Sequence, residues 1–324
     1  MDSCWVISDG AAGNRNQALA LAHGLDLEPR VFDITLAAPW TWLAPFAPRD
    51  PRRALATLPA GFTPPWPSLA IGCGRASAGI VLGLKRLSRG HTRAVQILDP
   101  RWRRAQFDAL IIPAHDDVSG DNVITSIGSL NRIDDAWLAE GRARFPALGQ
   151  LPSPRTAVLI GGPVADVPLD DDYIDGLLHS LSAWQARDGG SFLVTCSRRT
   201  PTVLAQRLRQ AFAAWPGLFW AGEIDGANPY PGVLAWADRI VVTPDSSNLL
   251  GEASAVGVPV YAHLPPTLTL QRKRQHLVKH LRDRGHLHAL HPTAPSVSDV
   301  PPPLRDLPRI TAAVRARLRP PPLL

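Results

Sequence analysis

The sequence predicts an α/β protein made of two doubly wound units, each with a parallel sheet covered by helices. Three observations lead to this fold class. The length of 324 residues exceeds what one hydrophobic core usually organises, so two domains are expected. Short apolar runs are continuous rather than alternating, which is typical of strands buried on both faces. These runs alternate with stretches of helical periodicity, and the whole pattern restarts after residue 154.

The first unit begins with a strand at residues 4–7 and a helix at 16–23 that Gly24 ends. A second strand at 30–34 precedes a loop rich in Pro and Trp over 39–67. The other elements expected in this unit are strands at 69–72, 94–98, 109–112 and 123–125 and a helix at 76–87.

A hinge is expected at residues 150–154, because two prolines break the periodicity just before a new strand. The second unit then repeats the alternation of strands and helices. Its expected strands lie at 157–160, 191–196, 218–220, 239–243 and 258–261, and its helices at 173–187, 203–214, 233–237 and 248–255.

The chain ends with a basic helix at 272–284, a proline-rich stretch after Pro292 and a last helix at 307–318. The last helix carries an apolar stripe at helical spacing, so we expect it to pack back on the first domain. The predicted domains are therefore an N-terminal one over 1–149, a C-terminal one over 150–291 and the closing segment over 292–324, with a cleft between the two domains.

Composition excludes several classes of protein. A chain with 45% hydrophobic and 19% charged residues is globular rather than disordered. No apolar run reaches the roughly 18 residues of a membrane-spanning helix, and no secretory signal is recognisable at the start. Three widely separated cysteines exclude a disulfide scaffold and argue against a zinc cage. We therefore expect a cytoplasmic protein, with peripheral contact to the inner face of the membrane as an alternative.

The net charge of +6 has two interpretations. Only three of the 34 basic residues are lysine, a bias that GC-rich coding DNA also produces. The basic residues are scattered and form no run with interleaved aromatics, so we expect no nucleic-acid partner. Phosphorylated small molecules suit this charge equally well.

Charged residues gather where strands of the first unit end. Ligands of an open parallel sheet bind beyond the carboxyl ends of its strands, so these residues are candidates for a site. The loop after the first strand adds small residues and helix amides that attract anions, but it lacks the G-x-G-x-x-G fingerprint and a Walker lysine, which disfavours NAD and P-loop binding. The candidates are Asp9, Gly13, Asn14, Gln17, Arg75, Asp99, Arg101, His115 and Asp116.

The second unit offers groups suited to a diphosphate. Arg198 and Arg199 follow a strand, and guanidinium groups pair with phosphates in bidentate fashion. Ser246 or Ser247 can cap the next helix, whose free amides and dipole favour an anion. Glu252 lies one to two turns further on, within reach of a ribose hydroxyl. The candidate residues of this unit are Gly161, Gly162, Ser197, Arg198, Arg199, Asn228, Tyr230, Thr243, Asp245, Ser246, Ser247 and Glu252.

The segment over residues 238–260 resembles the donor-nucleotide segment of GT-B glycosyltransferases. Further motifs narrow the resemblance to the mitochondrial fission "elongated mitochondria" family, whose bacterial members form a domain of unknown function. These motifs are Gly161-Gly162-Pro163, Ser197-Arg198-Arg199-Thr200-Pro201, Asn228-Pro229-Tyr230, Gly72-Cys73-Gly74-Arg75, Asp99-Pro100-Arg101 and His115-Asp116. The resemblance runs from about residue 5 to residue 285.

This resemblance implies that the second unit binds a nucleotide-diphospho sugar and that the first binds an acceptor, which the sequence does not identify. Arg198 and Arg199 would hold the diphosphate and Glu252 the ribose, without a metal or another cofactor. Asn228 and Tyr230 would line the nucleobase pocket, although a plain turn explains them equally well.

A general base must deprotonate the acceptor hydroxyl, and we favour His115, with Asp116 or Asp9 as its partner or substitute. Two alternatives to a glycosyltransferase remain. One is a non-catalytic scaffold that acts through protein or membrane contacts, and the other is a nucleotide-sugar epimerase. Asp170-Asp171-Asp172 contains an Asp-x-Asp pattern, but it precedes a helix, where acidic residues suit the dipole without a metal.

Overall fold

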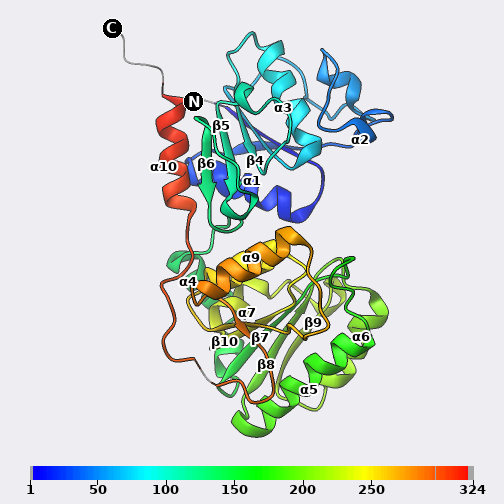
Figure 1. Ribbon diagram of the computed structural model, residues 1–324, viewed down its shortest axis with the longest axis vertical. Coiled ribbons are helices and arrows are strands. Elements are labelled where there is room, and N and C mark those ends of the chain that lie inside the picture. Colours follow the sequence, from blue (N-terminus) through cyan, green and yellow to red (C-terminus); the bar gives the residue numbers. More distant parts are fainter. Residues whose placement is uncertain (1–2, 296, 320–324) are drawn as a thin grey trace. The chain divides into compact units, whose positions relative to one another are not determined.

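A computed structural model describes residues 3–295 and 297–319. The chain forms two compact units, one containing the residues up to Arg132 and those from Asp306 on, the other Ile133 to Arg305. Each unit contains a six-stranded sheet of parallel strands (Figure 1), which confirms the predicted α/β class with two doubly wound sheets. No helix in the described part of the chain is long and apolar enough to cross a bilayer.

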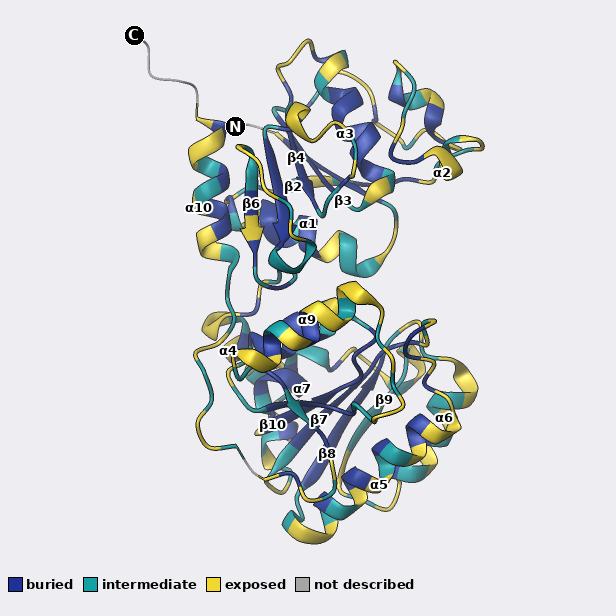
Figure 2. Cartoon of the chain, in the orientation of Figure 1, coloured by how far each residue is buried: buried dark blue, intermediate teal, exposed yellow. Residues whose placement is uncertain are grey.

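The sheet of the first unit has the strand order β2-β1-β3-β4-β5-β6. Strands β1, β3 and β5 are buried along their whole length (Figure 2), as the continuous apolar runs predict. The strands are β1 (Cys4–Ser8), β2 (Pro29–Asp33), β3 (Leu69–Cys73), β4 (Arg93–Ile97), β5 (Ala109–Pro113) and β6 (Val123–Ser126). The helices are α1 (Ala12–Gly24), α2 (Trp40–Leu43), α3 (Arg75–Leu87) and α10 (Leu307–Leu318).

The closing helix α10 belongs to the core of the first unit. Ile310, Val314 and Leu318 are buried in the same cluster as residues of α1. Asp306, just before the helix, accepts a hydrogen bond from the amide of Ile127 at 2.9 Å. The apolar stripe seen in the sequence thus faces α1 and the edge strand β6.

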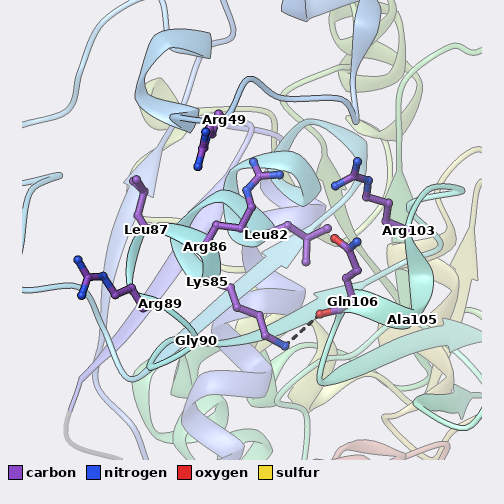
Figure 3. A pocket seen from close by; sticks show the side chains of 10 residues that line it. All are labelled: Arg49, Leu82, Lys85, Arg86, Leu87, Arg89, Gly90, Arg103, Ala105 and Gln106. Carbon is purple, nitrogen blue, oxygen red and sulfur yellow. Dashed lines mark hydrogen bonds between the residues drawn. The ribbon is translucent and has the colours of Figure 1, made fainter.

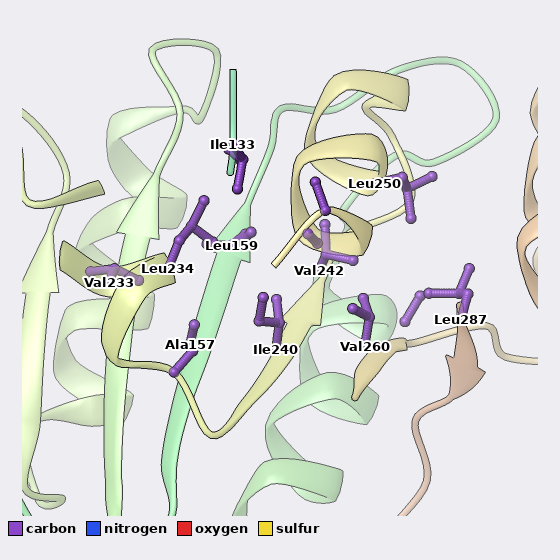
Figure 4. Close-up of a cluster of buried hydrophobic side chains, with 14 of the residues drawn as sticks. Ile133, Ala157, Leu159, Val233, Leu234, Ile240, Val242, Leu250, Val260 and Leu287 are labelled. Carbon is purple, nitrogen blue, oxygen red and sulfur yellow. The ribbon is translucent and has the colours of Figure 1, made fainter. Parts of the chain in front are cut away.

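The sheet of the second unit has the order β12-β11-β10-β7-β8-β9. Buried side chains from its strands and from the helices beside them form a continuous apolar cluster (Figure 4). The strands are β7 (Arg155–Ile160), β8 (Ser191–Cys196), β9 (Gly217–Trp220), β10 (Arg239–Val242), β11 (Val260–Ala262) and β12 (His288–Ala289). The helices are α4 (Asp135–Arg144), α5 (Asp171–Asp188), α6 (Thr202–Phe212), α7 (Tyr230–Trp236), α8 (Ser247–Ser254) and α9 (Arg272–Asp283).

The second unit starts at Ile133, earlier than the boundary expected at residues 149 and 150. The reason is helix α4, which the sequence analysis missed because only Leu138 and Gly141 of it are buried. Two side-chain hydrogen bonds join α4 and the residue after it to the end of α7. Arg142 donates to the carbonyl of Ala235 at 2.9 Å, and the indole of Trp236 donates to the carbonyl of Phe145 at 3.0 Å. Helix α4 therefore packs on α7 and belongs to the second unit.

The proline-rich stretch also stays with the second unit, up to Arg305 rather than 291. Its backbone is tied there because the amide of Leu304 donates to the carbonyl of Ser254 at 2.9 Å. The guanidinium of Arg305 donates to the carbonyl of Ala255 at 3.0 Å. Only from Asp306 on does the chain return to the first unit.

Candidate functional site

Strand order fixes where each sheet can form a binding site. The crevice of an open parallel sheet lies at the carboxyl edge where the strand order reverses. In the second unit the chain runs from β7 outward to β8 and β9, and then returns to the other side of β7 as β10. The reversal therefore lies between β7 and β10, and the loops after these strands hold the predicted residues 161–162 and 243–247.

The side chain of Asp245 joins three loops at this reversal. Its carboxylate is fully buried and accepts hydrogen bonds from the amide of Gly162 at 3.0 Å and from the hydroxyl of Thr243 at 2.6 Å. The guanidinium of Arg199, after β8, donates to it at 2.7 Å. Thr243 in turn accepts from the amide of Gly161 at 2.8 Å. The loops after β7, β8 and β10 are thus held together by one buried charge.

Gly161 and Gly162 make room for these contacts. A Cβ at Gly161 would lie 2.1 Å from a carboxylate oxygen of Asp245, and one at Gly162 would lie 2.4 Å from the Cβ of Arg199. Both amide hydrogens are already donated to protein oxygens. The two glycines therefore position the loop, and their amides are not directed at a ligand.

The two arginines after β8 differ in their surroundings. Arg199 is held by Asp245, although its side chain is still 51% exposed. Ser197 helps to shape this loop, because its hydroxyl accepts from the amide of Arg199 at 3.2 Å. Arg198 is exposed and makes no hydrogen bond or ion pair within the described residues. Of the predicted pair, Arg198 is thus the guanidinium available to an anion.

Helix α8 begins directly after this network. The hydroxyl of Ser246 accepts a hydrogen bond from the amide of Leu249 at 3.4 Å, which makes Ser246 rather than Ser247 the capping residue. Ser247 is exposed in the first turn. The start of α8 therefore lies beside Asp245, with its dipole directed at the same edge of the sheet.

Glu252 and Tyr230 form a direct pair. The hydroxyl of Tyr230 donates to Oε2 of Glu252 at 2.5 Å. Burial raises the pKa of Glu252 above its usual value of 4.5, and the bond from Tyr230 offsets this only in part. Asn228 is exposed, and its side-chain oxygen accepts from the amide of Tyr230 at 3.0 Å, so it shapes the turn before α7.

Arg274 and Asp166 support the site and were missed by the sequence analysis. Arg274, on α9, donates to the backbone carbonyl of Asp245 at 2.5 Å and to that of Pro244 at 3.2 Å. The same guanidinium is bonded to Asp166 at 2.8 Å. Burial alone would raise the pKa of Asp166, but Arg274 and the amide of Gln271 outweigh it, and the pKa is lowered. The sequence shows Arg274 only as one cation of a basic helix.

In the first unit the strand order reverses between β1 and β3. The carboxylate of Asp9, after β1, accepts from the side-chain amide of Asn14 at 3.0 Å and from the amide of Ala11 at 3.1 Å. Cys73, at the end of β3, donates its thiol to Asn14 at 3.5 Å, and burial raises its pKa. The structure thus brings Asp9 and Asn14 together at the reversal of this sheet.

Most other candidates of the first unit already have protein partners. Asp99 accepts from the amide of Arg101 and from Arg104, both at 2.8 Å. Gln17 is buried, and its side-chain oxygen accepts from the amide of Leu130 at 3.2 Å. Arg75 is exposed and donates to the carbonyl of Ala44. In the structure these side chains are thus bonded to other parts of the first unit.

His115 and Asp116 lie together after β5, in a short 3-10 helix (Ala114–Asp116). Nε2 of His115 is 4.0 Å from the carboxylate of Asp116, and both side chains are mostly buried. Strands β3 and β4 separate β5 from β1. Three strand spacings of about 4.8 Å therefore lie between His115 and Asp9, so the two do not form one acid–base pair. Gly13, in the first turn of α1, is partly exposed.

Comparison with known proteins gives one family match and two relatives. The family described as "Mitochondrial fission ELM1" matches residues 12–318. The Arabidopsis thaliana protein "Mitochondrial fission protein ELM1" is 31% identical over 220 residues, which are 60% of this chain and 51% of that protein. This chain therefore spans about half the length of the Arabidopsis relative. A Rickettsia prowazekii protein, RP120, is 28% identical over 304 residues, which are 81% of this chain and 83% of that protein.

Solved structures of similar fold include a UDP-GlcNAc 2-epimerase and a forosaminyltransferase. The UDP-GlcNAc 2-epimerase from Methanocaldococcus jannaschii aligns over 98% of this chain and 100% of its own, with a TM-score of 0.53 and 10% identity. The spinosyn forosaminyltransferase SpnP aligns over 98% of this chain and 94% of its own, with a TM-score of 0.50 and 15% identity. At such identity the likeness is one of fold, and the fold is that of GT-B glycosyltransferases and epimerases.

Proposed function

Because the chain belongs to the mitochondrial fission ELM1 family and has a GT-B-like fold, we propose that it is a metal-independent glycosyltransferase that uses a nucleotide-diphospho sugar. The second unit takes the donor and the first unit takes the acceptor. The observation that carries this proposal is the exposed Arg198, which has no carboxylate partner within the described residues and lies in the loop that Arg199 joins to Asp245, just before α8. Helix amides and a guanidinium together suit a diphosphate.

In this proposal the site stabilises the leaving group. The acceptor oxygen attacks the anomeric carbon while the bond from that carbon to the diphosphate oxygen breaks. The nucleoside diphosphate leaves with the electron pair, and Arg198 and the first turn of α8 offset the developing charge. His115 or Asp9 takes the proton of the acceptor hydroxyl. Asp245 and Arg274 do not touch the reacting atoms, because their role is to hold the loops in place.

Titration calorimetry with UDP, GDP, ADP and their sugars at low ionic strength tests the donor site. We expect at least one nucleotide to bind and Arg198→Gln to weaken its affinity about tenfold or more, because a charge-assisted hydrogen bond contributes about 1.5–3 kcal/mol. Arg282→Gln is a matched control, since it removes an exposed arginine from α9 of the same unit. Absence of binding by every nucleotide to the folded protein would contradict the proposal.

A second candidate is a non-catalytic scaffold with the same fold. It is favoured by the finding that two of the predicted donor groups, Arg199 and Glu252, already have protein partners. A scaffold would bind none of the nucleotides in the same titration. If a nucleotide-sugar binds, product analysis with and without candidate acceptors separates transfer from epimerisation, because an epimerase converts the donor without an acceptor.

A further inference from the structure

The first unit contains a basic pocket away from the proposed acceptor residues. It is about 710 Å³ in volume, and its lining includes Arg49, Lys85, Arg86, Arg89 and Arg103 (Figure 3). A volume of this size falls within the range of small-molecule sites, about 300–1,000 Å³.

The pocket lies at the amino edge of the sheet. Residues 85–90 are the end of α3 and the turn that leads into β4, and residues 103–106 lead into β5. Asp9 and His115, by contrast, follow the carboxyl ends of their strands. The basic pocket is therefore at the opposite end of the parallel strands from the proposed acceptor site.

Five cations line the basic pocket, and none of its described lining residues is acidic. Lys85 is neutralised by Asp108, whose carboxylate lies 2.7 Å away. Within the described residues the four arginines form no ion pair. Arg86 donates to the carbonyl of Pro48 at 3.1 Å, and Arg103 lies over the ring of Trp102 at 4.8 Å. An uncompensated positive charge therefore remains.

The arginines are close enough to repel one another. Burial first, and then the charges of Arg103 and Arg49, lower the pKa of Arg86. In Figure 3 the guanidinium groups of Arg86 and Arg103 extend toward each other. Gathering like charges in a concave site costs free energy, and an anion placed among them removes that cost.

We propose that the basic pocket binds the phosphate group of a phosphate-bearing ligand, separately from the donor site. Arginines that have no carboxylate partner within the described residues suit a group with two or more negative charges, because a guanidinium can donate to two phosphate oxygens. The same chemistry is offered by a soluble phosphate compound and by an anionic lipid headgroup. All four arginines are exposed, so the affinity should fall as ionic strength rises.

The test uses pyrophosphate as the probe, in an Arg198→Gln background that removes the proposed donor cation. Calorimetry at low ionic strength should detect binding, and adding Arg49→Gln should weaken it about tenfold, the loss of one charged hydrogen bond. Arg53→Gln is the matched control, because Arg53 is also exposed, lies four residues further along the chain in a 3-10 helix (Pro51–Ala54) and does not line the pocket. It removes the same charge and should leave the affinity unchanged.

Sedimentation with phosphatidylcholine vesicles, with and without phosphatidylglycerol, identifies the source of the phosphate. Binding to the anionic vesicles that Arg49→Gln weakens and Arg53→Gln does not would assign a lipid headgroup. Sensitivity confined to pyrophosphate would assign a soluble ligand. Equal losses in the two variants would overturn the proposal, because diffuse surface charge then explains the binding. Binding of neither probe would overturn it as well, whatever the donor site does.

Discussion

The carboxylate of Asp245 shows how one buried charge can organise a site without touching its ligand. It accepts from an amide, a hydroxyl and a guanidinium that come from three loops. Sequence alone could place Asp245 after a strand but not assign its partners, because they lie 46 and 83 residues away along the chain. The same limit explains why Arg198 and Arg199 look alike in the sequence, although within the described residues only the guanidinium of Arg199 has a carboxylate partner.

Glu252 allows the functional and structural hypotheses to be separated. Glu252→Gln keeps the shape and an acceptor for Tyr230 but removes the charge. If Glu252 binds ribose, nucleotide affinity should fall roughly 10- to 150-fold while the melting temperature of the free protein at neutral pH hardly changes or rises. Calorimetry and thermal unfolding measure the two effects. Unchanged affinity with a large loss of stability would assign Glu252 a purely structural role.

The pH dependence of the same variant has a definite sign. Because burial raises the pKa of Glu252 in the folded state, the wild-type protein loses stability as the pH rises from 4.5 toward that higher pKa. The glutamine variant has no such proton to lose. The stability of the variant relative to wild type should therefore increase over this interval, which urea unfolding at a series of pH values can follow.

At the scale of elements, helix α9 matters more than its basic surface suggests. The sequence predicts a basic helix at 272–284, and the structure confirms it as α9, with Leu277, Val278 and Leu281 buried. The bonds of Arg274 to the loop carbonyls could not be predicted, because nothing in the sequence distinguishes Arg274 from the other arginines and lysines of this helix. Helix α4 was missed for a related reason: it buries too few residues to show a clear period.

Arg274→Gln should destabilise the protein by about 2–3 kcal/mol at neutral pH, because the mostly buried Asp166 loses its charged partner. Nucleotide affinity should fall as well, since the loop before α8 loses two hydrogen bonds. Arg274 keeps the pKa of Asp166 below 3.8 in the folded state, so its stabilisation is present above that pH and is lost as the pH falls. The difference between variant and wild type should therefore shrink in acid.

Urea unfolding between neutral and acid pH checks this sign. Arg272→Gln is the control, because Arg272 is exposed on the same helix and its side chain makes no hydrogen bond or ion pair within the part of the chain that the structure describes. A variant at position 274 as stable as this control would show that the bonds to the loop contribute little.

At the scale of the whole molecule, the two doubly wound sheets follow from the sequence because continuous apolar strands and helical periods are local signals. The unit boundaries do not. The expected hinge at residues 150–154 lies inside the second unit, where Asp238 accepts from the amide of Arg155 at 2.7 Å and from the hydroxyl of Ser153 at 3.1 Å. Prolines show in the sequence where the periodicity stops. Long-range contacts, however, decide to which unit the residues around that point belong.

The last prediction concerns helix α10, which returns to the first unit after the whole second unit has been completed. Ile310 is fully buried among residues of α1 and the sheet, so Ile310→Ala should destabilise the first unit by about 2–4 kcal/mol through the cavity it leaves. Because each unit has its own core, hydrogen exchange should accelerate in α1 and β6 and stay unchanged in β7 and β8. Ile224→Ala is the control, since Ile224 is 96% exposed and should affect neither unit. Exchange of α10 in the wild-type chain as fast as in an unfolded peptide would show that this helix does not complete the first core, and equal acceleration in both units would show that the two cores unfold together.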